Sequence, residues 1–147
     1  IHGYVGCPFA WRVRLAAAEK GVEAAWIPCD VDDPDPRAAA HNPEEHSPLL
    51  WHDGFVLRES EIIMLYLDET CGGRALLPSE PRERARLRLT SVRLAALDAH
   101  TEPSRPAARK KSEPALRLLA ESLAGRAFLH GDEPGLYDLV WWPFLAN

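Results

Sequence analysis

The chain has 147 residues, 46% of them hydrophobic and 27% charged, which is typical of a globular protein with room for one compact domain or two small ones. Its net charge of −5 argues against a general nucleic-acid-binding protein. No apolar run reaches the roughly 18 residues of a membrane span, so we expect no membrane partner.

Charge is unevenly spread along the chain. Residues 1–80 carry 6 lysines and arginines against 14 acidic residues, whereas residues 81–147 carry 11 against 8. The resulting charges of −8 and +3 indicate two structural units.

The first part of the chain predicts a strand, a helix and a second strand. Residues 1–5 form a short strand, and Pro8 suits the first turn of a helix because its missing N–H has no partner there. Apolar residues then recur at helical spacing up to a C-cap at Gly21. Residues 22–29 alternate as a strand does, so we expect a parallel pair joined by a helix.

An acidic loop at 30–36 and a short helix at 37–40 are expected next. Residues 49–51 and 55–57 are apolar runs on either side of an Asp-Gly turn, which predicts a hairpin. A third helix is expected to begin with Ser60 as its N-cap.

From Pro81 onward the pattern is helical only, after a linker at 72–80. One face shares Leu89, Val92 and Ala96, a second helix spans Leu116 to Leu123, and the last helix starts at 134–138. We expect Trp141 and Trp142 to pack in the helical core. The whole order is β-α-β-α-β-β-α followed by helices.

Cys7 raises the main functional question, because it stands directly before the helix that Pro8 begins. A helix N-terminus has free N–H groups and the positive end of the dipole, and both favour a thiolate. A buried, inert cysteine is the alternative, and the residues alone leave the two equally weighted. Arg12 and Arg14 are candidates for supporting a thiolate or its ligand.

These residues together resemble a cytosolic glutathione transferase. The resemblance rests on Cys7-Pro8-Phe9-Ala10, on Ser47-Pro48-Leu49-Leu50, and on Glu59-Ser60 before a helix. The Cys-Pro-Phe-Ala motif is most similar to the omega-like, cysteine-type branch. The resemblance implies a thioredoxin-like domain at 1–71, a linker at 72–80, and an all-α domain at 81–147 that looks shortened.

The resemblance also implies a binding site for glutathione as co-substrate. Its residues are the nucleophile Cys7 and the glutathione contacts Phe9, Ser47, Pro48, Glu59 and Ser60. Pro48 is expected to follow a cis peptide bond and to face the thiol, so that the backbone of Ser47 pairs with the cysteinyl part of glutathione. Ser60 is assigned to the γ-glutamyl carboxylate and Glu59 to the nearby ammonium.

The glycine carboxylate of glutathione lacks an obvious cation. Family members often place a lysine where this chain has Asp32-Asp33-Pro34-Asp35, so Arg37 or His46 would have to substitute. The histidines and glutamates between His41 and His52 are interpreted as solvated loop residues, and we expect no metal.

The function implied is that of a glutathione-dependent thiol transferase or reductase. It would remove glutathione from disulfides, or reduce small disulfides and electrophiles, through a mixed disulfide on Cys7. Ala10 replaces a resolving cysteine, so a second thiol must release the first. The alternatives are a non-catalytic binding or scaffold protein of the same fold, and a related dehalogenase, isomerase or quinone reductase.

The resemblance also implies a homodimer. An odd cysteine count of three and the lack of a charged-then-apolar leader favour a cytoplasmic location. Both ends of the chain are expected to be trimmed, because it starts inside one apparent strand and stops inside one apparent helix.

Overall fold

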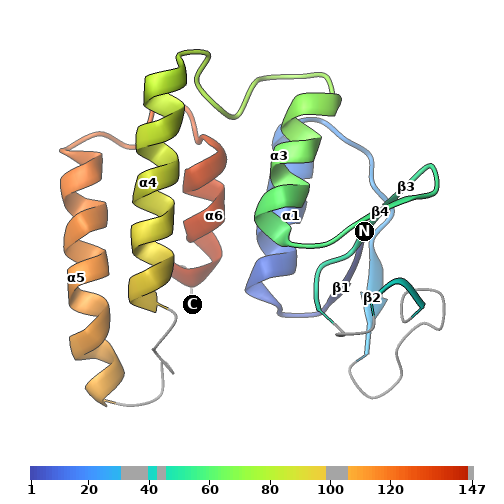
Figure 1. Cartoon of the computed structure of the whole chain (residues 1–147), viewed down its shortest axis with the longest axis horizontal. Coiled ribbons are helices and arrows are strands. Elements are labelled where there is room, and N and C mark those ends of the chain that lie inside the picture. Colours follow the sequence, from blue (N-terminus) through green and yellow to red (C-terminus); the bar gives the residue numbers. More distant parts are fainter. Residues whose placement is uncertain (31–39, 43–45, 99–105, 146–147) are drawn as a thin grey trace. The chain divides into compact units, whose positions relative to one another are not determined.

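The computed structural model describes residues 1–30, 40–42, 46–98 and 106–145 (Figure 1). The acidic loop after Asp30, most of the helix expected at 37–40 and the candidate ligand Arg37 lie outside them. The elements in chain order are β1 (His2–Tyr4), α1 (Pro8–Glu19), β2 (Ile27–Cys29), β3 (Leu50–His52), β4 (Phe55–Leu57), α3 (Ser60–Thr70), α4 (Pro81–Asp98), α5 (Pro106–Leu123) and α6 (Leu136–Leu145).

The strands form one parallel and one antiparallel pair. β1 pairs with β2 in parallel, with His2 opposite Ile27, and β3 pairs with β4 in the antiparallel sense. His2 and Leu49 exchange two backbone hydrogen bonds, of 2.8 and 2.9 Å, which join the two pairs. The predicted α/β class with mixed strand directions is confirmed.

The second strand is shorter than the alternation of residues 22–29 predicts. Only Ile27–Cys29 pair with β1, because β1 itself offers three residues as partners. Val22 instead donates its N–H to the carbonyl of Ala17, which caps the C-terminal end of α1.

Contacts divide the chain into two compact units. One unit holds Ile1–Leu76 together with Asp138–Asn147, and the other holds Leu77–Tyr137. The helix α6 therefore groups with the strands. The domain limits of 1–71, 72–80 and 81–147 stay a prediction.

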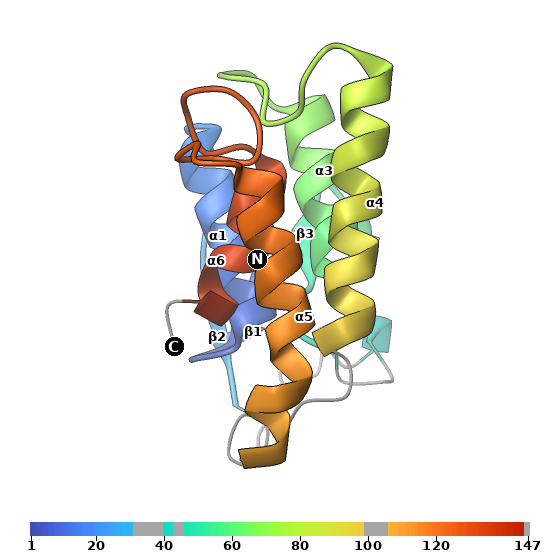
Figure 2. The same ribbon diagram turned by 90° about the vertical axis from the view of Figure 1, so that its left-hand side faces the viewer.

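In the first unit, α1 and α3 lie side by side (Figures 1 and 2). Their facing side chains are fully or almost fully buried: Val13, Ala16 and Ala17 of α1, and Ile63, Met64 and Leu67 of α3. This apolar contact fixes how the N-termini of the two helices lie, and those N-termini carry the candidate site.

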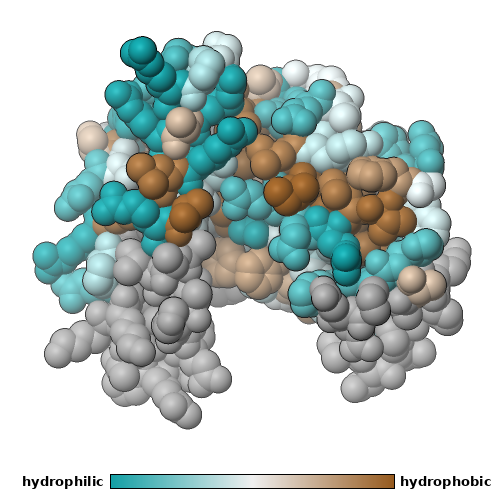
Figure 3. All heavy atoms as spheres, viewed as in Figure 1, coloured by the Kyte–Doolittle hydropathy of each residue, from teal (hydrophilic) through white to brown (hydrophobic). Residues whose placement is uncertain are grey.

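The second unit contains α4 and α5, which also lie side by side (Figures 1 and 2). The predicted apolar face of α4 is exposed, with Leu89 and Val92 at 59% and 65% exposure. Figure 3 shows the same feature as brown atoms between teal ones over α4.

The two tryptophans of α6 differ in burial. Trp141 is buried, but Trp142 is 58% exposed, so the prediction that both pack in a core is wrong. Neighbouring residues of a helix point about 100° apart, and the buried face of α6 is taken by Leu139, Val140 and Pro143. Among the described residues, no helix combines the length and apolar character that crossing a membrane requires.

Candidate functional site

Cys7 lies at the N-cap of α1, as the sequence predicts. Its backbone is extended, with φ −68° and ψ 119°, and Pro8 begins the helix. The carbonyl of Cys7 accepts the first helical hydrogen bond, from the N–H of Trp11 at 3.0 Å. The half-buried thiol thus sits where the first-turn N–H groups have no partner within the helix.

The cis peptide bond expected before Pro48 is present, and its neighbour Ser47 faces the thiol. Cys7 Sγ donates to the carbonyl oxygen of Ser47 at 3.9 Å. The Ser47 hydroxyl accepts the N–H of Tyr4 at 3.1 Å, which ties this loop to the end of β1. No described residue accepts the backbone N–H of Ser47.

Ser60 does not cap α3, and this expectation is wrong. The helix begins at Ser60, and the N-cap is Glu59, whose backbone has φ 65° and whose side chain makes no capping hydrogen bond. The Ser60 hydroxyl instead accepts two hydrogen bonds from Arg12, from Nε at 2.9 Å and from Nη2 at 2.5 Å. The guanidinium occupies the lone pairs that a cap would use.

Arg12 lies in the candidate site and bonds Ser60, a contact that the sequence pattern does not identify. Its guanidinium lies 5.0 Å from the centre of the Phe9 ring, and that ring meets Phe144 edge to face at 5.3 Å. Burial lowers the pKa of Arg12, while Glu61, Glu59 and Cys7 act in the opposite direction. Arg12 therefore brings a positive charge between the thiol and the start of α3.

Glu59 and His46 lie close together, with Oε1 and Nδ1 3.8 Å apart, and both side chains are largely exposed. Asn42 holds the His46 backbone through hydrogen bonds of 2.6 and 3.1 Å. Glu59 is expected to bind the ammonium of glutathione and His46 its glycine carboxylate, which are at opposite ends of the ligand. Their proximity therefore disfavours His46 as partner of the glycine carboxylate.

The other candidate groups lie apart from this cluster or make different contacts. Arg14 stacks over the ring of Trp26 at 4.9 Å. Cys29 Sγ lies 3.8 Å from the carbonyl of Ile27, and Cys71 follows the end of α3. No group of three or more histidine, cysteine, aspartate or glutamate side chains within the described ranges is arranged to hold a metal ion.

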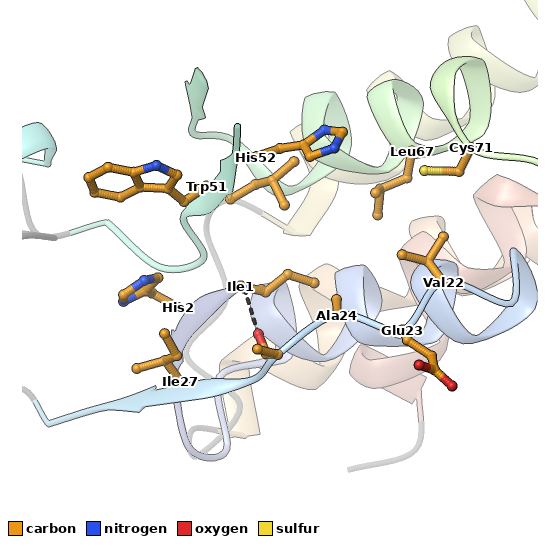
Figure 4. Close-up of a pocket in the computed structure, with 12 residues that line it drawn as sticks. Ile1, His2, Val22, Glu23, Ala24, Ile27, Trp51, His52, Leu67 and Cys71 are labelled. Atoms are coloured by element: carbon orange, nitrogen blue, oxygen red, sulfur yellow. Dashed lines mark hydrogen bonds between the residues drawn. The ribbon is translucent and has the colours of Figure 1, made fainter. Parts of the chain in front are cut away.

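A cavity of about 480 Å³ lies elsewhere in the first unit (Figure 4). Val22, Leu67 and Cys71 lie at one end of it, and His2 and Trp51 at the other. It shares no lining residue with the cluster of Cys7, Ser47 and Ser60. The candidate site therefore lies outside this cavity.

Comparison with known proteins identifies relatives of the chain. The family model described as "Glutathione S-transferase, N-terminal domain" matches residues 1–75. A maize protein named glutathione transferase GST 23 is 31% identical over 163 residues, which cover all of this chain and 73% of the maize protein. Glutathione transferase omega-1 of Caenorhabditis elegans is 31% identical over 150 residues, which cover 96% of this chain and 60% of the nematode protein.

A solved structure of rice GST1, in complex with glutathione, superposes with a TM-score of 0.87 at 27% identity. The match covers 99% of this chain and 73% of the rice chain. The chain thus spans between 60% and 73% of the lengths of these relatives.

Proposed function

The chain belongs to the glutathione transferase family, and we propose from this that it binds glutathione and uses it as a thiol co-substrate. The rice relative was solved with glutathione bound, and it shares the fold over nearly the whole of this chain. The chain's own site offers a thiol, a Ser47 N–H that no described residue accepts, and a hydroxyl at the start of α3.

We further propose that the protein is a thiol transferase or reductase of the omega-like, cysteine type, with Cys7 as nucleophile. The observation that carries this is the position of the Cys7 thiol at the N-cap of α1, close to the Ser47–Pro48 turn. The N-terminus of α1 and the nearby Arg12 guanidinium both place positive charge beside this thiol.

The proposed reaction is thiol–disulfide exchange in two steps. The Cys7 thiolate attacks a disulfide of glutathione, forms the mixed disulfide with one sulfur, and expels the other sulfur as a thiolate. A second glutathione thiolate then attacks the glutathione sulfur of the mixed disulfide, which yields oxidised glutathione and restores the Cys7 thiolate. Each step exchanges one thiolate for another, so the sum converts a mixed disulfide of glutathione and one glutathione thiolate into the substrate thiolate and oxidised glutathione. No other oxidant or reductant is needed, and the second substrate of this cycle is a small disulfide.

Glutathione is proposed to lie across the two helix N-termini. The Ser47 backbone would pair with its cysteinyl part beside Pro48, Ser60 would hold the γ-glutamyl carboxylate, and Glu59 the ammonium. Phe9 would contact the ligand beside the thiol. The partner of the glycine carboxylate is not among these residues, and Arg37 stays the candidate.

The test is the intact mass of the protein after incubation with oxidised glutathione. Wild type should gain one glutathione, which added reduced glutathione removes, and Cys7→Ser should gain none. Cys71→Ser is the matched control, because it removes a half-buried thiol outside the site and should still be modified. A folded wild type that stays unmodified would favour the non-catalytic binding protein of the same fold.

We also propose a homodimer, since α4 exposes Leu89 and Val92 among arginines and the first 80 residues are acidic. A second copy would cover this apolar face and complement its charge. Light scattering coupled to size-exclusion chromatography should give twice the mass of 16.4 kDa, and Val92→Glu should give the monomer.

A cytoplasmic location stays a prediction.

A further inference from the structure

The Ser60 hydroxyl is fixed in an unusual way. A serine hydroxyl has one O–H donor and two lone pairs that accept. Arg12 donates to it twice, from Nε at 2.9 Å and from Nη2 at 2.5 Å, so both lone pairs are occupied. Only the O–H is left to form a further hydrogen bond.

That remaining O–H has no acceptor among the described residues. Ser60 is 4% exposed, so bulk water satisfies the group poorly, and a buried unsatisfied donor is costly. The hydroxyl is therefore prepared for a ligand group that accepts a hydrogen bond. A carboxylate fits this position, and an ammonium does not.

We propose that Arg12 is a positioning residue that turns the Ser60 hydroxyl into a dedicated donor for the γ-glutamyl carboxylate. The inference rests on the proposed function, because that function supplies the ligand. It adds that carboxylate selectivity resides in the pair of Arg12 and Ser60, which are 48 residues apart in the sequence.

The surroundings of Arg12 keep the guanidinium in place. The face of the Phe9 ring lies 5.0 Å from its central carbon. Glu59 and Glu61 stand at the start of α3 and attract its charge. A lysine at this position would carry the same charge but would lack the rigid pair of parallel donors.

The test is titration calorimetry of the full chain with two probes. One probe is reduced glutathione, and the other is its analogue lacking the α-carboxylate of the γ-glutamyl residue. The variants are Arg12→Met, Ser60→Ala and the double substitution. Arg14→Met is the matched control, because Arg14 is on the same helix and stacks on Trp26 instead.

Arg12→Met should weaken glutathione binding about ten- to a hundredfold, as expected for a hydrogen bond to a charged group. Binding of the decarboxylated analogue should change less than about twofold. In the Ser60→Ala background, Arg12→Met should have almost no further effect, because the two residues act as one unit. Arg14→Met should leave both affinities unchanged.

Equal weakening for both probes would overturn the inference, since it would mean that Arg12 only supports the local structure. Additive effects of Arg12→Met and Ser60→Ala on glutathione affinity would also overturn it. If wild type binds no glutathione, the proposed function is overturned together with this inference. If wild type and Arg12→Met bind glutathione with equal affinity, only this inference is overturned. Circular dichroism verifies that each variant is folded. If Arg12→Met is unfolded, Arg12→Lys is used in its place, and it too is expected to weaken glutathione binding.

Discussion

Replacing Asp68 by alanine is expected to destabilise the first unit by about 3–5 kcal/mol, because the substitution leaves a buried ammonium without its carboxylate. Lys20 Nζ lies 3.1 Å from Asp68 Oδ1, and the two side chains are 2% and 8% exposed. The same Oδ1 accepts the backbone N–H of Leu76 at 2.8 Å. Alanine thus removes the partner of a charge and of a backbone donor.

Part of the loss is offset by other contacts. Lys20 keeps the carbonyl oxygens of Asp68 and Arg74, at 3.3 and 3.0 Å, as acceptors. These are dipoles and not a full charge, so the Coulomb attraction of the carboxylate is not replaced. Asp68→Asn retains an acceptor for both donors and should lose less than alanine, about 1–3 kcal/mol.

Urea unfolding followed by tryptophan fluorescence measures this loss. All five tryptophans of the chain fall in the first unit, so the signal reports on that unit alone. Glu19→Gln is the control, because Glu19 pairs with Arg74 at 2.9 Å with both side chains about a third exposed. Such a pair contributes up to about 1 kcal/mol. A loss for Asp68→Ala no larger than for Glu19→Gln would refute the reasoning.

Two further substitutions test local features of the chain. Gly73→Ala should lower the unfolding free energy by more than about 1 kcal/mol, because Gly73 has φ 85° and an added Cβ would lie 2.7 Å from a backbone oxygen. Gly72→Ala is the control, because a Cβ added there meets no atom within 4 Å, and this variant should match wild type in thermal melts. Backbone hydrogen bonds from Arg82 and Glu83 lower the pKa of Glu80 below 4.5, so its carboxylate stabilises α4 above pH 4.5 and loses this effect as pH falls through the lowered value. The difference in melting temperature between wild type and Glu80→Gln should therefore close on acidification, and a pH-independent difference would contradict this origin.

Local sequence signals predict the elements that depend on neighbouring residues. The Asp-Gly hairpin is confirmed, with positive φ of 49° at Asp53 and 83° at Gly54. The start of α1 at Pro8 is also confirmed. Both features are decided within four or five residues, which a pattern in the sequence records directly.

The errors arise where a distant residue decides the outcome. Ser60 has the sequence of an N-cap, but Arg12 competes for its lone pairs from another helix. Residues 22–26 alternate like a strand, but the pairing partner is only three residues long. No local pattern records either competitor, so the Arg12–Ser60 contact could not be predicted from sequence.

The geometry of the candidate site depends on the register between α1 and α3. Arg12 bonds Ser60 and Lys20 bonds Asp68, and both pairs are separated by 48 residues, so the two helices run in the same direction. Eight residues, or about 12 Å of helix, separate the two contacts. The pair at the C-terminal ends therefore helps to keep both N-termini side by side. Their partial positive charges act together near Cys7 and Ser60, where a thiolate and a carboxylate are proposed to lie. Loss of the Asp68 carboxylate should for this reason weaken glutathione binding even in protein that stays folded.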